Sequence, residues 1–224
     1  MKLNTINILG ILGLIASIIV GVGEYFLHYS PQILEHSEHF AFFNFVPLEH
    51  LKTGHFLSVI GLPFYFAGYL HIYKMLQSGN ENLARITLGI GFMAFAVGGI
   101  WIGSRAFIGT IVHLQSEISP NTYQIILNNY NELLEVLVKA LRIIIALLSI
   151  TFILAILKGG TKYKRWMAFF NPITILIVWV IIGRLFPSFG KHTLPILMNV
   201  THFILFSISL YQYQIFLKTN PKSL

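Results

Sequence analysis

Ionisable side chains occur in segments of this chain that are otherwise apolar, and their types are those that transfer protons. Glu24 and His28 are four residues apart, so on a helix they share one face. Asn199 and His202, three residues apart, share a face of the last apolar segment. A carboxylate or an imidazole in such a place can serve as a general acid or base. The sequence therefore predicts Glu24, His28 and His202 as catalytic residues.

A second set of polar side chains is predicted to bind a ligand. One charged stripe, formed at spacings of three and four residues on a helix, consists of Glu132, Glu135, Lys139 and Arg142. Four basic groups against three glutamates make the predicted pocket slightly cationic, so we expect an anionic or lipid-like amphiphile, whose phosphate or other anionic group arginine can bind bidentately. The predicted ligand-binding residues are His55, Arg105, His113, Glu135, Lys139, Arg142, Arg184 and Asn199.

The ionisable side chains gather toward one end of each apolar segment. Such a group costs about 2.5–3.5 kcal/mol at the centre of a membrane span. Counting residues from the segment ends puts these groups in the outer half of the membrane, with His71 as the exception. We interpret this asymmetry as a polar pocket open to the outer side, which binds or converts the amphiphile. The alternative is a buried ion-pair network, in which Glu24 pairs with Arg105 or Arg184 and fixes the helix register.

Other kinds of chemistry are excluded or stay as alternatives. The chain has no cysteine, which excludes disulfides, thiolate metal sites and cysteine nucleophiles. Metal binding is conceivable if Glu24, His28, His55, His113 and His202 converge, but no His-Glu-x-x-His motif is present and no metal ligands are predicted. The sequence leaves the cofactor unknown. One alternative function is a proton-coupled transporter, with Glu24, His28 and His202 as proton carriers. Another is a non-catalytic assembly or structural protein, and whether the protein is an enzyme stays open.

The elements that must position these residues are six apolar segments. Hydrophobic residues make up 55% of the chain and charged residues 10%, against roughly 25% charged residues in a soluble domain. A helix crosses the hydrocarbon core in about 20 apolar residues. The segments that qualify are 6–28, 54–76, 85–113, 132–157, 166–186 and 194–217. The sequence predicts an all-α polytopic membrane helix bundle that forms one transmembrane domain over residues 1–224.

The third of these segments is rich in glycine. It contains Gly99-x-x-x-Gly103, a spacing that permits close approach between membrane helices. We therefore expect this segment to pack closely against a neighbouring helix.

Lysine and arginine in the loops predict the orientation, because cytoplasmic loops of membrane proteins collect these residues. With six spans, nine of them lie on the side of both termini and two, Lys52 and Lys191, on the other. Both termini are therefore predicted to be cytoplasmic, in a multi-pass protein of the cell membrane. The first outer loop, 29–53, carries aromatic and charged residues and is predicted to lie partly at the membrane interface.

The net charge of +7 follows from this loop bias and does not indicate a nucleic-acid partner. No basic patch interleaved with exposed aromatic residues is apparent in the sequence. Membrane lipids are the expected partners, and the sequence predicts no oligomeric state.

Three short motifs carry a resemblance to a known group of proteins. They are Gly23-Glu24-Tyr25-Phe26-Leu27-His28-Tyr29, Gly54-His55-Phe56-Leu57 and Gly98-Gly99-Ile100-Trp101-Ile102-Gly103-Ser104-Arg105. With these motifs the chain resembles an uncharacterised bacterial family of six-helix polytopic membrane proteins, in which a Gly-acidic signature ends the first helix. The resemblance covers most of the chain. It implies a bacterial membrane protein and implies no activity.

Overall fold

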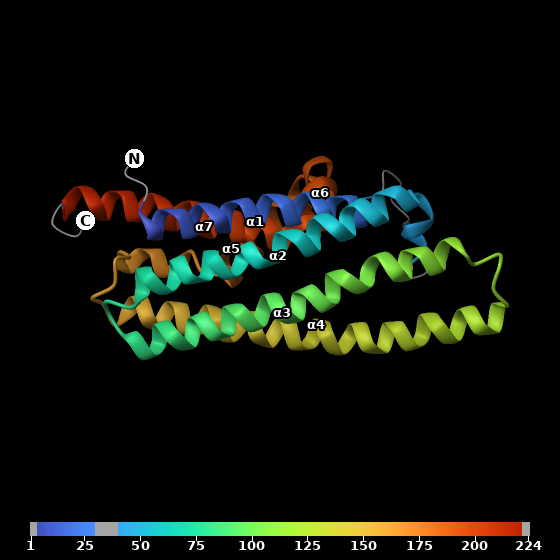
Figure 1. Cartoon of the computed structure of the whole chain (residues 1–224), viewed down its shortest axis with the longest axis horizontal. Helices are drawn as coiled ribbons and strands as arrows, with labels where there is room; N and C mark the ends of the chain where they lie inside the picture. The colour runs from blue at the N-terminus through green and yellow to red at the C-terminus, as the bar shows by residue number, and fades with distance from the viewer. Residues whose placement is uncertain (1–3, 30–39, 221–224) are drawn as a thin grey trace.

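The computed structural model describes residues 4–29 and 40–220, and within these ranges the chain forms helices and no strand (Figure 1). In chain order the elements are α1 (Thr5–His28), η1 (Ala41–Phe45), α2 (Leu48–Leu76), α3 (Glu81–His113), α4 (Pro120–Leu157), η2 (Arg165–Phe169), α5 (Pro172–Leu185), α6 (Pro187–Thr193), η3 (Leu194–Ile196) and α7 (Leu197–Thr219), where η marks a 3-10 helix. Five helical stretches of the described chain are long and apolar enough to cross a membrane, the last being the continuous unit Pro187–Thr219. The all-α bundle is confirmed, and these stretches support a multi-pass membrane protein.

The fifth predicted span differs from the prediction. Residues 166–186 do not form one helix, because the chain breaks at Asn171 between η2 and α5. Asn171 caps α5 by accepting a 3.1 Å hydrogen bond from the Thr174 amide, and Pro172 is the first helical residue. A residue before proline avoids the helical region, and Asn and Pro together favour a helix start. With 14 residues, α5 is about 21 Å long, shorter than the roughly 30 Å hydrocarbon core.

The α3–α4 hairpin is longer than predicted. Helix α4 begins at Pro120, capped by Ser119, where Ser119-Pro120 indicates a helix start, and its 38 residues extend well beyond the predicted span 132–157. At 1.5 Å per residue α4 is about 57 Å long, more than the roughly 40–45 Å of a whole bilayer. In Figure 1 the hairpin extends past the other helices at one end of the bundle. We call this end, where α1 ends and α2 begins, the outer end, and the opposite end, where α1 begins and α7 ends, the inner end.

The described part of the first outer loop contains η1 and the start of α2, which begins at Leu48 rather than at the predicted residue 54. Residues 30–39 of the predicted interfacial segment 29–53 lie outside the described residues. The beginning of α1 and the end of α7 lie together at the inner end (Figure 1).

Glycines allow α1 and α2 to pack backbone against backbone. A Cβ placed on Gly13 would lie 2.6 Å from the Cα of Gly68, and one on Gly23 would lie 2.8 Å from the carbonyl oxygen of Gly54. Along α2, Gly54, Gly61 and Gly68 recur every seven residues and so face α1 together. Lipid tails are as apolar as the side chains, so close contact of this kind is what stabilises membrane helix pairs.

The close approach predicted for Gly99-x-x-x-Gly103 is therefore wrong in its location. A Cβ on Gly103 would meet no atom within 4 Å, and one on Gly99 would meet only the end of the Leu62 side chain, at 2.9 Å. Gly98 is open in the same way. The glycine motif of α3 faces space, and the tight glycine interface lies between α1 and α2.

We predict that Gly68→Ala lowers the melting temperature of the purified protein in detergent. The added methyl group would lie 2.5 Å from the Phe206 ring and 2.9 Å from the Gly13 Cα, and overpacking of this kind typically costs about 1–3 kcal/mol. The control is Gly89→Ala, where no atom lies within 4 Å and alanine improves helix propensity by about 0.5–1 kcal/mol. Equal melting temperatures for the two variants would contradict the proposed packing.

Candidate functional site

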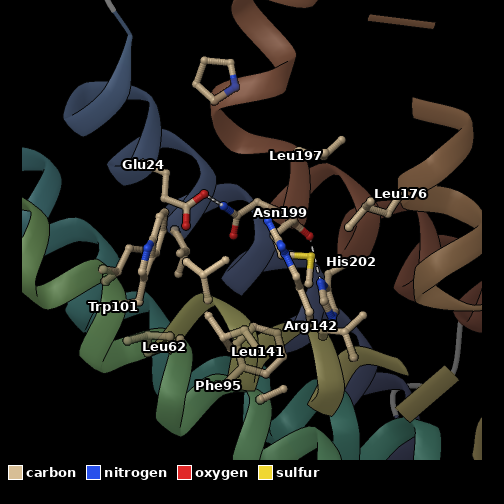
Figure 2. A pocket seen from close by; sticks show the side chains of 18 of the residues that line it. Glu24, Leu62, Phe95, Trp101, Leu141, Arg142, Leu176, Leu197, Asn199 and His202 are labelled. Carbon is tan, nitrogen blue, oxygen red and sulfur yellow. Dashed lines mark hydrogen bonds between the residues drawn. The ribbon is translucent and has the colours of Figure 1, made fainter. Parts of the chain in front are cut away.

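A cavity of about 500 Å³ lies between the α3–α4 hairpin and helices α1, α2, α5 and α7 (Figure 2). Its walls are mostly apolar, with Leu62 from α2, Ile102 from α3, Ile145 from α4 and Leu176 from α5 as examples. The charged and strongly polar side chains among its lining residues are Glu24, Arg142, Asn199 and His202. All four belong to the predicted site, and the structure brings them together.

Glu24 is fixed by a chain of buried hydrogen bonds. Its Oε2 accepts a 2.5 Å hydrogen bond from Nδ2 of Asn199, whose Oδ1 accepts a 2.6 Å bond from the Tyr65 hydroxyl. The Tyr65 ring stacks on Phe95 with centroids 3.8 Å apart. Glu24 is only 7% exposed, and the described residues offer it no ion pair. Glu24 is therefore held at the cavity wall without an ion pair, and its nearest cationic influence is the Arg105 guanidinium beside the cavity.

His202 lines the cavity, but both of its ring nitrogens are already hydrogen bonded. Nδ1 donates a 2.8 Å bond to the Met198 carbonyl oxygen, since a carbonyl can only accept. In the neutral ring Nε2 is then the acceptor, and the Tyr69 hydroxyl donates to it over 2.9 Å. A ligand in the cavity would reach the imidazole as a base only by displacing Tyr69.

Arg142 differs from the other polar residues of the cavity because it is exposed rather than buried, and because it makes no hydrogen bond or ion pair with the described residues. It enters from α4, fifteen residues before that helix ends at Leu157, which is about 22 Å along the axis. That distance is inside the hydrocarbon core for a helix whose inner end lies at the membrane surface. Figure 2 shows its side chain reaching into the cavity on the side of Asn199 and His202.

Arg105 and His28 lie next to the cavity and bond to each other. Arg105 Nε donates a 2.9 Å hydrogen bond to His28 Nε2, so that nitrogen is an acceptor and His28 is neutral. The guanidinium lies 5.0–5.8 Å from the centroids of four aromatic rings, which belong to Phe40, Phe42, Phe43 and Trp101. A guanidinium at this distance is attracted to each ring face. This cluster joins η1 to α1 and α3 at the outer end.

The other predicted site residues do not line the cavity. His113 Nε2 donates to the Val46 carbonyl oxygen over 2.9 Å, and His55 packs between Phe56 and Phe107. Lys139 and Glu135 pair with each other at 3.3 Å with side chains 68% and 59% exposed.

Arg184 is also exposed, at the end of α5. The ion pairs that the alternative interpretation predicted for Glu24 are not present, because neither Arg105 nor Arg184 forms one with it. Each ion pair in the described chain joins residues three or four positions apart on one helix.

A second polar cluster lies at the inner end around His71, the exception among the predicted ionisable groups, and its uncharged member Ser209 was not predicted. His71 Nδ1 donates to the Ile6 carbonyl oxygen over 2.8 Å, and its Nε2 accepts from Ser209 over 2.7 Å. The Tyr163 hydroxyl in turn bonds the Ser209 oxygen at 2.5 Å. Burial raises the pKa of Tyr163, so its hydroxyl stays protonated and donates. Every side-chain polar atom of this inner cluster therefore has a partner. The cluster joins α1, α2, α7 and the α4–α5 connection.

Phe206 separates the two clusters. Its ring is fully buried and contacts Tyr65, Tyr69 and His202 with centroids 5.9–6.1 Å apart. A Cβ on Gly68 would touch the same ring. No hydrogen bond in the described chain crosses this layer.

No three His, Asp or Glu side chains of the described residues lie together in an arrangement that could hold a metal ion. Glu24 and His28, which share a face as predicted, bond to Asn199 and Arg105 respectively.

The comparisons with known proteins identify a family and no activity. A family model described as a family of unknown function (DUF6796) matches residues 1–214. No curated protein and no solved structure matches the chain. The resemblance to an uncharacterised family is supported to that extent.

We predict that Ser209→Ala destabilises the protein by about 1–3 kcal/mol, because it leaves His71 and Tyr163 buried without their shared partner. The control is Ser207→Ala, two residues away on α7, where the described chain makes no side-chain hydrogen bond. Thermal unfolding in detergent should show a clear drop for Ser209→Ala alone. If the two variants melted together, the inner cluster would have no structural role.

Proposed function

The chain belongs to the family of unknown function DUF6796, and we propose that this member binds a lipid-like amphiphile within the membrane, in the cavity between its helices. The observation that carries the proposal is Arg142, an arginine that lines an apolar cavity without a protein partner. A charged group inside a membrane is costly and normally pairs with other groups, so an unpaired one indicates a ligand.

The shape and lining of the cavity support an amphiphile. A volume of about 500 Å³ falls within the roughly 300–1,000 Å³ of ligand pockets, which are mostly apolar with a few orienting polar groups. The apolar walls suit an alkyl chain, while Arg142 suits an anionic or phosphate group, which arginine binds bidentately. Lipids of the surrounding bilayer are the most abundant molecules with this chemistry.

The contacts of His202 and His28 favour binding over conversion. Both rings already use their Nε2 as an acceptor, from Tyr69 and Arg105 respectively. Glu24 keeps one oxygen that bonds no described residue. The catalytic roles predicted for Glu24, His28 and His202 stay predictions, and we propose a binding protein whose ligand leaves unchanged.

We further propose that the protein lies in a bacterial cytoplasmic membrane with both ends of the chain in the cytoplasm. The nine lysines and arginines assigned to one side of the membrane, against two on the other, support this orientation. The cavity then opens in the outer half of the membrane, since Glu24 is four residues from the outer end of α1 and thus about 6 Å from it.

We expect Gly98→Leu to reduce ligand binding several-fold. Gly98 lines the cavity and has no atom within 4 Å of its Cβ position, so leucine would fill the cavity without a clash. The measurement is crosslinking of a diazirine-bearing palmitate to the protein in phospholipid vesicles. Gly89→Leu, equally unhindered on the same helix but away from the cavity, is the control and should label like the wild type. Unchanged crosslinking of cavity peptides in Gly98→Leu would refute the proposed site.

The proposed orientation predicts which introduced cysteines react with a reagent from outside the cell. The sequence has no native cysteine, so all labelling reports on the introduced one. Lys191→Cys on α6 should react with a membrane-impermeant maleimide in spheroplasts, and Lys164→Cys, before η2, only after permeabilisation. Both native side chains are exposed in the structure. The reverse pattern would invert the proposed topology.

A further inference from the structure

The cavity contains one carboxylate and one guanidinium that do not pair with each other. Glu24 and Arg142 both line it, yet no ion pair joins them among the described residues. Glu24 uses one oxygen to accept from Asn199, and Arg142 bonds no described residue at all. Opposite charges attract strongly in a medium of low dielectric constant, so two that stay apart in one cavity require a reason.

The reason is that Glu24 is anchored. Asn199 binds the carboxylate, Tyr65 binds Asn199, and the stacked pair of Tyr65 and Phe95 fixes that hydroxyl in turn. Figure 2 shows Glu24 entering from α1 and Arg142 from α4, with Asn199 of α7 between them. The two charges are therefore presented from different walls of one cavity.

We propose that the head group of the bound amphiphile carries both a primary ammonium, which lies against Glu24, and a phosphate, which Arg142 binds. This inference rests on the proposed function, because it specifies the head group of the same ligand. A carboxylate only accepts hydrogen bonds and an ammonium only donates them, so the two match in charge and in hydrogen bonding. A guanidinium matches a phosphate in the same two respects.

Head groups of other charge fit the cavity less well. A purely anionic head group would bind Arg142 and leave the second oxygen of the buried Glu24 without a hydrogen-bond donor. A trimethylammonium group has the charge of an ammonium but no N–H to donate to Glu24. Arg105 attracts Glu24 electrostatically, but it forms no hydrogen bond with it, and its Nε donates to His28 instead. The cavity should therefore prefer phosphatidylethanolamine to phosphatidylglycerol and to phosphatidylcholine.

The test uses the full-length protein purified in detergent and three synthetic phospholipids with identical acyl chains. Native mass spectrometry with equal amounts of phosphatidylethanolamine, phosphatidylglycerol and phosphatidylcholine should show the first retained at least several-fold more than the others. Glu24→Gln should remove this preference, and Arg142→Gln should lower retention of all three lipids. The matched controls, Glu117→Gln and Arg165→Gln, change exposed residues outside the cavity and should keep the wild-type preference.

The outcomes separate this inference from the function on which it rests. Equal retention of the three lipids by the wild type overturns the head-group assignment, and because this arm uses no variant, it does not depend on Glu24→Gln folding. If Gly98→Leu still lowers that retention, the binding function stands. If the wild type retains no lipid, or if Gly98→Leu retains as much as the wild type, the proposed function fails as well.

Discussion

A polar group in a hydrocarbon layer has no water to bind, so it must find its partner within the protein or in a ligand. The two ends of this bundle meet that constraint differently. At the inner end His71, Ser209 and Tyr163 satisfy one another and the Ile6 carbonyl oxygen completely. In the outer half Arg142 has no partner among the described residues. The polar groups of the inner cluster therefore satisfy one another, and the unpaired Arg142 is the observation on which the proposed lipid binding rests.

The cavity exists because packing is uneven among the helices. Glycines such as Gly13 and Gly68 bring α1 and α2 into backbone contact, and α7 packs beside them with Phe206 buried between the clusters. The α3–α4 hairpin has no such interface on its cavity side, where Gly98 faces open space. Helix α5, which starts at Pro172, contributes Ile173 and Leu176 to the cavity wall. The cavity therefore lies where the α3–α4 hairpin meets the other helices without a glycine interface.

The sequence predicts the helices better than it predicts their lengths or their facing sides. Composition and apolar run length were enough to find every long helix, because hydrocarbon demands about 20 apolar residues. The break at Asn171 was missed because apolar residues continue on both sides of it. Of the charged stripe on α4, only Arg142 reaches the cavity. Glu135 and Lys139 instead pair with each other on an exposed face of α4, and the spacing of the charged residues does not tell which of them meets the cavity. The hydrogen bonds of the uncharged residues Tyr65 and Ser209 were not predicted. The free-energy cost of burying a polar group becomes apparent only when its burial is known.

Lipid binding in the cavity is tested most directly by a crystal structure of the protein grown in a lipid mesophase that contains phosphatidylethanolamine with a brominated acyl chain. Anomalous scattering would locate the bromine independently of how the map is interpreted. We predict a bromine peak inside the cavity, among the side chains of Leu62, Ile145 and Leu176. Bromine peaks confined to the outer surface of the bundle, with the cavity empty or filled by side chains, would contradict it.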